Sequence, residues 1–162
     1  MPISYLVWAG SSPPTPGLYA QELVFRRDAL WSHARDDAEI RFADEDADTT
    51  THVSALDGER FIGSVVFIRR GKDQHGSGRL CQMAVAPDYQ GSGIGRELVR
   101  RLERHLKETS ETPVKVEVHA QLSAVGFYEK VGYEAVDGES DFEEEGIMHR
   151  LFSKTITPDK SV

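Results

Sequence analysis

The chain has 162 residues, a hydrophobic fraction of 39% and a formal net charge of −8 at pH 7. This length fits one domain with a substantial core, so we expect a single domain over 1–162 in which 152–162 is a frayed tail. The acidic balance argues against a general nucleic-acid binder, and the lone Cys81 excludes a disulfide framework. Neither a leader-like N-terminus nor a long apolar run is present, so we expect a cytoplasmic location and no membrane partner.

The N-terminal part of the chain predicts a strand, a loop and a helix. Residues 3–8 form a short run of β-formers, and 10–17 hold glycines and prolines that break regular structure. Residues 18–35 have helical spacing of apolar residues. We expect the charged residues of this helix, which are Glu22, Arg26 and Arg27, to lie on its surface.

Residues 36–48 are acidic and poor in bulky apolar side chains. We interpret them as a solvated loop with a short strand at 40–42. A calcium site is disfavoured, because the glycine and the final glutamate of an EF-hand loop are missing at the required positions.

Three successive strands follow in an antiparallel meander. Residues 50–56 and 60–68 are joined by Asp57-Gly58, a strong hairpin signal between two strand-forming runs. The turn region 71–78 then leads into a third strand, which ends at Ala86 before Pro87.

The stretch after Pro87 joins this strand to a helix through a glycine-rich turn. Gly91, Gly93 and Gly95 lie in the turn, and apolar residues recur at helical spacing from Ile94 to Leu106. Glycines let a ligand approach the backbone, and the unpaired first amides of a helix attract phosphate oxygens. The alternative is a tight strand-to-helix turn without a ligand. The spacing fits neither a P-loop nor a dinucleotide fingerprint.

The C-terminal part alternates strands and one helix. Val114, Val116 and Val118 alternate with polar residues and predict a half-buried strand. Residues 121–131 predict a helix that stops at Gly132. A strand at 133–136, an acidic loop at 137–146 and a last strand at 147–152 complete the chain.

Two motifs resemble those of the GCN5-related N-acetyltransferases (GNAT). The run Gln90-x-x-Gly93-x-Gly95 resembles the family's pyrophosphate loop, and the segment 118–133, VHAQLSAVGFYEKVGY, resembles its second motif. Within the family the chain is most similar to the ElaA-like group, through H-A-Q-x-x-A-x-x-F-Y and Gly146-Ile147-x-His149. The resemblance implies an α/β (α+β) GNAT fold. Its mixed, mostly antiparallel sheet of six to seven strands is flanked by helices and splays between the strand ending at Ala86 and the strand 114–119.

The resemblance implies a site for acetyl-coenzyme A as cosubstrate, without a metal. Backbone amides of Met83, Ala84 and Val85 would hold the pantetheine arm and the thioester, with the Val85 amide facing the oxyanion. Gln121 would contact the coenzyme arm. The loop that would bind the diphosphate consists of Gln90, Gly91, Ser92, Gly93, Ile94, Gly95 and Arg96.

Tyr128 matches the family tyrosine that donates to the coenzyme sulfur, and its ordinary pKa near 10 suits a general acid. The alternative is a tyrosine packed between helix and sheet. His119 and His149 are candidate bases and could equally be structural histidines, while Glu117 could act through a water. Cys81 shares strand parity with Met83, although an inert buried thiol is the simpler interpretation.

The leading hypothesis is therefore an N-acetyltransferase acting on a primary amine of a small molecule or peptide in a ternary complex. A coenzyme A-binding module of the same fold without turnover is the alternative, and a plain α/β domain is a third. Dimers are common among the proteins that this chain resembles, so a homodimer stays open.

Overall fold

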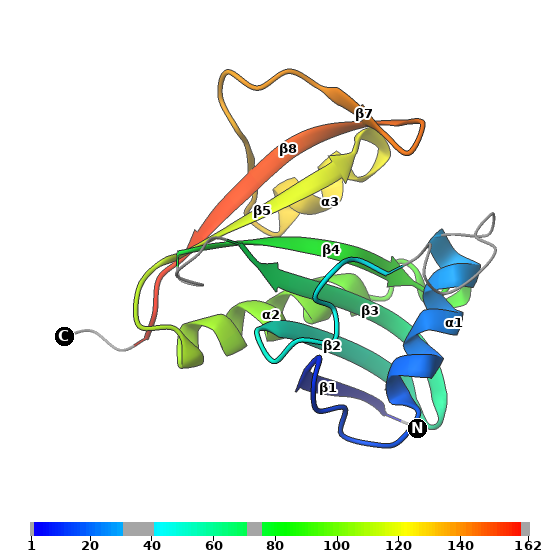
Figure 1. Cartoon of the computed structure of the whole chain (residues 1–162). Helices are drawn as coiled ribbons and strands as arrows, with labels where there is room; N and C mark the ends of the chain where they lie inside the picture. Colours follow the sequence, from blue (N-terminus) through cyan, green and yellow to red (C-terminus); the bar gives the residue numbers. More distant parts are fainter. Residues whose placement is uncertain (1, 31–40, 71–75, 160–162) are drawn as a thin grey trace. The chain divides into compact units, whose positions relative to one another are not determined.

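The first three strands form an antiparallel sheet in this computed structural model (Figure 1). They are β1 (Ile3–Ala9), β2 (Thr50–Asp57) and β3 (Arg60–Arg69). Gly58 adopts φ 61° in the predicted hairpin turn between β2 and β3, a conformation that glycine tolerates. The residues that the structure describes are 2–30, 41–70 and 76–159.

Helices α1 (Leu18–Leu30) and α2 (Ile94–Thr109) pack on opposite faces of this sheet. A Cβ atom at Gly63 would lie 3.2 Å from side-chain atoms of Ile94 and of Leu98, so this face of β3 receives α2. His52 has the opposite strand parity and contacts Glu22 of α1. Both helices thus bury their inner sides against the same three strands.

Strand β4 (Ser77–Val85) is interrupted at Gln82, which has φ 54°. A non-glycine residue in this region costs about 1–2 kcal/mol, and the Ser64 hydroxyl supports it by donating to the Gln82 carbonyl at 3.2 Å. β4 pairs in parallel with β5 (Val114–Gln121), and the paired residues of β4 end at Leu80 although the strand continues. This early end agrees with the expected splay.

Strand β8 (Ile147–Ile156) runs antiparallel to β5 along its whole length and also pairs with two short strands. These are β6 (Glu134–Ala135) and β7 (Phe142–Glu144). The hydrogen-bonded order is β1-β2-β3-β4-β5-β8-β6, with β7 on β8. The predicted GNAT fold class is confirmed, with eight strands in the described residues rather than six to seven.

The C-terminal predictions need four corrections. β5 extends to Gln121, a 3₁₀ turn (Leu122–Ala124) follows, and α3 covers only Val125–Lys130. β7 lies inside the predicted acidic loop. The frayed tail was placed too early, because Ile156 is 2% exposed in β8.

One prediction in the N-terminal half is also wrong. The strand expected at 40–42 is absent at Arg41 and Phe42, and residue 40 lies outside the described residues.

The chain forms two compact units. Unit 1 comprises Met1–Ile68 and Gln82–His105, and unit 2 comprises Arg69–Cys81 and Leu106–Val162. Unit 1 therefore holds β1–β3, α1, the end of β4 and most of α2. Unit 2 holds the start of β4, β5–β8 and α3. None of the described helices is both long enough and apolar enough to cross a membrane.

Candidate functional site

The glycine-rich turn of unit 1 consists of a short 3₁₀ turn (Pro87–Tyr89) and an exposed loop that opens into α2. Gly91 and Gly93 have φ 82° and 88°, and a Cβ atom on either would meet nothing within 4 Å. The Glu97 amide donates to the Gly93 carbonyl at 3.1 Å, the first bond that closes the helix. A ligand can therefore reach the backbone at both glycines.

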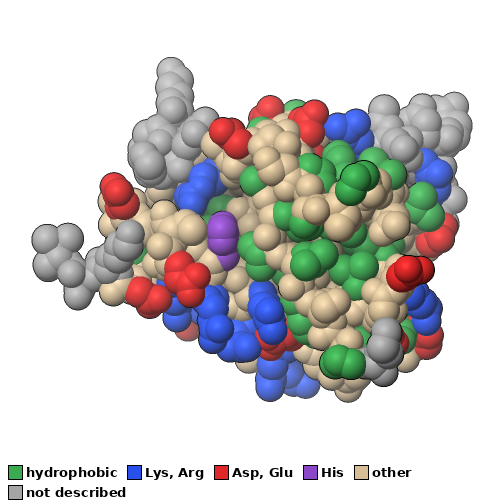
Figure 2. Space-filling view, turned by 90° about the horizontal axis from the view of Figure 1, so that it is seen from below, with side chains coloured by type: hydrophobic (Ala, Val, Ile, Leu, Met, Phe, Trp, Pro, Cys, Tyr) green, Lys and Arg blue, Asp and Glu red, His purple; other side chains and the backbone are tan. Residues whose placement is uncertain are grey.

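The backbone amides at the start of α2 favour the binding of an anion. Those of Ile94, Gly95 and Arg96 lie in the first turn, where no helical carbonyl precedes them, and the helix dipole adds positive potential. Exposed arginines continue this charge along the helix at Arg96, Arg100 and Arg104, each four residues apart. Figure 2 shows several Lys and Arg side chains grouped along the lower edge of the face it presents, with acidic side chains beside them.

The 3₁₀ turn before the loop is anchored to the β2–β3 hairpin. Arg60 forms a bidentate pair with Asp88 at 2.8 and 3.0 Å, and its guanidinium lies 5.3 Å from the centre of the Tyr89 ring. The Tyr89 hydroxyl donates to Asp57. These contacts hold the turn in a defined position, from which the loop projects.

The end of β4 presents an alternating surface next to this loop. Ala84 is buried, whereas Met83 and Val85 are partly exposed. The Gln90 side chain donates from Nε2 to the Val85 carbonyl at 3.1 Å, which ties the loop to the strand end. Cys81 is buried, and φ 54° at Gln82 breaks the regular pleat between Cys81 and Met83. The predicted shared parity therefore does not hold across this residue.

Tyr128 is the buried residue of α3 in unit 2, with 5% exposure. Its ring forms edge contacts with Phe127 and Tyr133, at centroid distances of 5.1 and 5.9 Å. Burial, with a smaller contribution from Cys81, raises the pKa of Tyr128 well above its ordinary value of 10.0. The phenol of Tyr128 therefore keeps its proton more firmly than that of a free tyrosine.

His119 of β5 belongs to a charged chain of contacts in unit 2. Its Nδ1 lies 2.8 Å from Glu144 Oε2, and Arg79 lies 2.9 Å from the other carboxylate oxygen. Burial opposes the charged form of Glu144, but the hydrogen bond with His119 and the charge of Arg79 outweigh it and lower its pKa. An ionised carboxylate only accepts, so His119 carries a proton on Nδ1.

His149 faces the same side of the sheet as His119. The register pairs Gln121 with His149 and His119 with Leu151, so the predicted residues of β5 and β8 share one face. The His149 Nδ1 donates to the Ile147 carbonyl at 2.7 Å. Phe142 stacks on His149 and meets His119 edge-on, at centroid distances of 5.8 and 5.1 Å.

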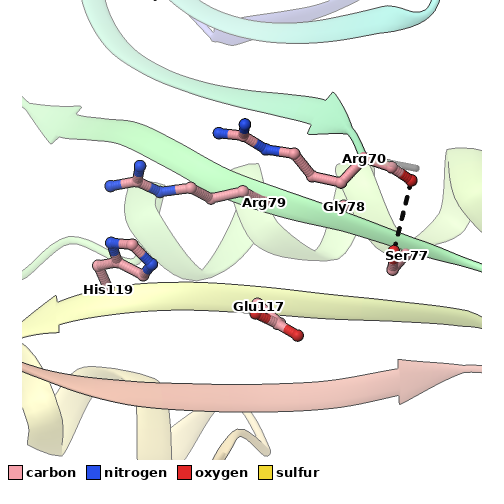
Figure 3. Close-up of a pocket in the computed structure, with 6 residues that line it drawn as sticks. All are labelled: Arg70, Ser77, Gly78, Arg79, Glu117 and His119. Carbon is pink, nitrogen blue, oxygen red and sulfur yellow. Dashed lines mark hydrogen bonds between the residues drawn. The ribbon is translucent and has the colours of Figure 1, made fainter. Parts of the chain in front are cut away.

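A cavity of about 320 Å³ lies on unit 2 (Figure 3). It contains the candidate base His119 together with Glu117, the other candidate considered on β5. Figure 3 shows the side chains of Arg70 and Arg79 extending in the same direction. The lining residues are Arg70, Ser77, Gly78, Arg79, Glu117 and His119.

Sequence reasoning missed four of the residues around this cavity. Arg70 and Arg79 were not among the predicted site residues, and Phe142 and Glu144 fell within the predicted acidic loop. A usable signal existed, because Phe142-x-Glu144 alternates with the period of a strand. Within the described residues no three His, Cys, Asp or Glu side chains are grouped to hold a metal ion.

Comparisons with known proteins agree with this geometry. Residues 21–156 match the sequence model of the acetyltransferase (GNAT) domain. Acetyltransferase ECA0875 of Pectobacterium atrosepticum is 37% identical over 86 residues, which are 52% of this chain and 57% of that protein. The chain spans about half the length of the curated relatives that it matches first.

Two solved structures share the fold at low sequence identity. Escherichia coli ElaA is 18% identical with a TM-score of 0.75, over 94% of this chain and 99% of that one. An aminoglycoside 6'-N-acetyltransferase, solved as a complex with coenzyme A, is 17% identical with a TM-score of 0.67, over 99% and 100%. The expected family is thereby confirmed, and the likeness to ElaA holds at the level of the fold.

Proposed function

Because the chain belongs to the acetyltransferase (GNAT) family, we propose that it transfers the acetyl group of acetyl-coenzyme A to the primary amine of a small molecule or peptide. The observation that carries this proposal is the open loop of unit 1, where Gly91 and Gly93 expose the first amides of α2. Support comes from ECA0875, named an acetyltransferase, and from the aminoglycoside enzyme solved with coenzyme A.

The proposed donor residues lie in unit 1. The loop residues Gln90, Gly91, Ser92, Gly93, Ile94, Gly95 and Arg96 bind the diphosphate through backbone amides, with Arg96 adding charge. Met83, Ala84 and Val85 offer backbone groups to the pantetheine arm, and the Val85 amide stabilises the oxyanion that forms as the amine attacks. Gln121 is the further residue proposed to make a polar contact with the arm.

Tyr128 is the proposed donor to the sulfur as the carbon–sulfur bond breaks. Its raised pKa means that the phenol stays neutral at physiological pH. A neutral phenol donates a hydrogen bond to a thiolate throughout the reaction, without first losing its proton to solvent. The family motif around Phe127 and Tyr128 supports this role over simple packing.

His119 is the proposed base that takes the proton from the attacking amine. Its Nδ1 proton faces Glu144, so the neutral ring keeps a lone pair on Nε2, and the residue lines the cavity of unit 2. His149 has the same tautomer through Ile147 but is only 6% exposed, and it serves as the second candidate. The new carbon–nitrogen bond thus forms as the amine proton moves to imidazole.

Calorimetric titration with acetyl-coenzyme A, followed by a thiol-release assay over a panel of amines, tests the proposal. We expect binding and amine-dependent thiol release. Binding without release from any amine would favour a coenzyme A-binding module. No binding at millimolar coenzyme would leave the glycine turn as a structural feature of a plain α/β domain.

Replacing Tyr128 with phenylalanine tests its chemical role. Tyr128→Phe should lower turnover by about 10²-fold or more while the coenzyme dissociation constant changes little, because only the hydroxyl is lost. Tyr5→Phe, which removes a hydroxyl from β1 next to Arg101 of α2, is the matched control and should keep full turnover. Equal turnover in both variants would reduce Tyr128 to a packing residue.

A further inference from the structure

We infer that the acceptor amine also carries an anionic group, a carboxylate or a phosphate, and that Arg70 binds this group in the cavity of unit 2. The inference rests on the proposed acetyl transfer and adds a substrate class to it. It depends on the net charge around the cavity, which is positive although the net charge of the whole chain is negative.

Most charged groups around the cavity already have a partner. Arg79 pairs with Glu144 at 2.9 Å, and the same carboxylate accepts from His119 at 2.8 Å. Glu117 lies 3.6 Å from the Lys115 ammonium. These contacts satisfy both carboxylates from within unit 2.

The Arg70 guanidinium is different. It lines the cavity at an exposed position just after β3, and no described carboxylate lies within ion-pair distance of it. Its backbone is fixed, because the Arg70 amide donates to the Ser77 carbonyl at 3.1 Å and the Arg70 carbonyl accepts from the Ser77 hydroxyl at 3.4 Å. A planar guanidinium carried by this anchored backbone is suited to bidentate binding of a carboxylate or phosphate.

Among the described residues, the charge at the cavity is positive. Its lining holds Arg70 and Arg79 against Glu117, and the partners Lys115 and Glu144 add one charge of each sign. An acceptor with one amine and one anionic group complements this arrangement, since the amine can approach His119 while the anion meets Arg70. A polycationic acceptor, such as an aminoglycoside, would meet excess positive charge. The volume of about 320 Å³ suits a small molecule.

Matched pairs of amines test the class of acceptor. β-Alanine and propylamine have similar length and differ in the carboxylate, while phosphoethanolamine and ethanolamine differ in the phosphate. We expect the KM of the preferred anionic amine to be about tenfold to a hundredfold lower than that of its neutral counterpart, with thiol release as the readout. The pair with the larger difference in KM shows whether the site prefers a carboxylate or a phosphate. Equal KM values within both pairs would overturn the inference.

Replacing Arg70 tests the residue. Arg70→Gln should raise the KM of the anionic amine to that of its neutral counterpart, with kcat unchanged, and Arg70→Lys should recover part of the loss. Lys107→Gln, which removes an exposed cation from the last turn of α2, is the control and should change neither value. An Arg70→Gln variant that weakens both members of a pair equally would contradict a specific contact with the anion.

Failure of this inference can be separated from failure of the proposed function. Thiol release from neutral amines only would overturn the inference and leave acetyl transfer standing. If no amine supports thiol release, the anion site can still be tested by binding. β-Alanine and phosphoethanolamine are then titrated calorimetrically into the wild-type protein and into Arg70→Gln. Binding of either that disappears in the variant would support the anion site, and no binding to the wild-type protein would overturn it.

Discussion

Two charged side chains of α1 are buried, contrary to the prediction that they lie on its surface. Glu22 and Arg26 are both 0% exposed and pair at 2.9 Å. Arg26 also pairs with Glu45 at 2.9 Å, and burial of the guanidinium is outweighed by both carboxylates, which raise its pKa. Glu45, read as part of a solvated acidic loop, is likewise fully buried. Its ionic partner comes from a helix far away in sequence.

His52 completes this cluster. Its Nε2 donates to the Glu45 carbonyl at 2.8 Å, and its Nδ1 lies 3.0 Å from a Glu22 carboxylate oxygen. Because a carbonyl oxygen only accepts, Nε2 carries a proton. Trp8 stacks on the imidazole at a centroid distance of 4.1 Å. The cluster joins α1, β2 and Glu45 through paired charges.

Removing one anion from this cluster should destabilise the protein. Glu22→Gln removes a buried carboxylate that pairs with the buried Arg26, and we expect a loss of about 3–5 kcal/mol in the free energy of unfolding, measured in urea. Asp28→Asn, which removes an exposed carboxylate of the same helix, should change it by no more than about 0.5 kcal/mol. Similar values for the two variants would show that the buried pairs contribute little.

At the scale of elements, the sequence predicted the end of β4, the glycine-rich turn and α2 closely. Two glycines stand where φ is positive, and the apolar period of α2 begins directly after them. Local signals suffice here because the turn and the helix are determined by neighbouring residues. The exposed amides follow from the same local geometry.

Gly93→Ala tests whether this geometry serves a ligand. A Cβ atom at φ 88° costs about 1–2 kcal/mol of stability and would occupy open space beside the loop backbone, so the coenzyme dissociation constant should rise about tenfold or more. Gly17→Ala is a close control, because Gly17 has φ 83° and the same open surroundings. It should lose similar stability while calorimetry shows unchanged coenzyme affinity. Equal affinity in both variants would contradict a role for the loop.

The elements of unit 2 were harder to predict. β7 is three residues long and contains two glutamates, which have low strand propensity, so its pairing with β8 decides its conformation. β8 extends to Ile156 because β5 offers partners up to that residue. Short strands of this kind depend on tertiary partners more than on their own sequence.

For the whole molecule, several carboxylates have a pKa below its ordinary value. The hydrogen bonds from Arg100 and Arg101 lower the pKa of Glu97 from 4.5 to about 2. Arg60 lowers the pKa of Asp88, and Arg150 lowers that of Asp141. The folded state therefore binds protons more weakly at these groups than the unfolded state does. Their stabilising contribution is complete above about pH 4.5 and is lost as the pH falls toward 2.

Acid should consequently reduce the stability of the protein in that window. We expect the free energy of unfolding in urea to decrease between pH 5 and pH 3, and to decrease less in Glu97→Gln, which lacks the group with the lowered pKa. Glu108→Gln removes an exposed carboxylate near the other end of α2 and serves as the control. A pH dependence that is identical in all three proteins would exclude Glu97 as a contributor.

The sequence by itself determined the family, the order of the main elements and the glycine-rich loop, because these depend on local period, turn chemistry and contiguous motifs. Only the tertiary structure decided which charges are buried and which are paired. Glu22, Glu45 and His52 meet across long separations in sequence, and Glu144 reaches His119 through a strand that forms only on β8. Such contacts depend on the register between strands, which composition and period do not specify.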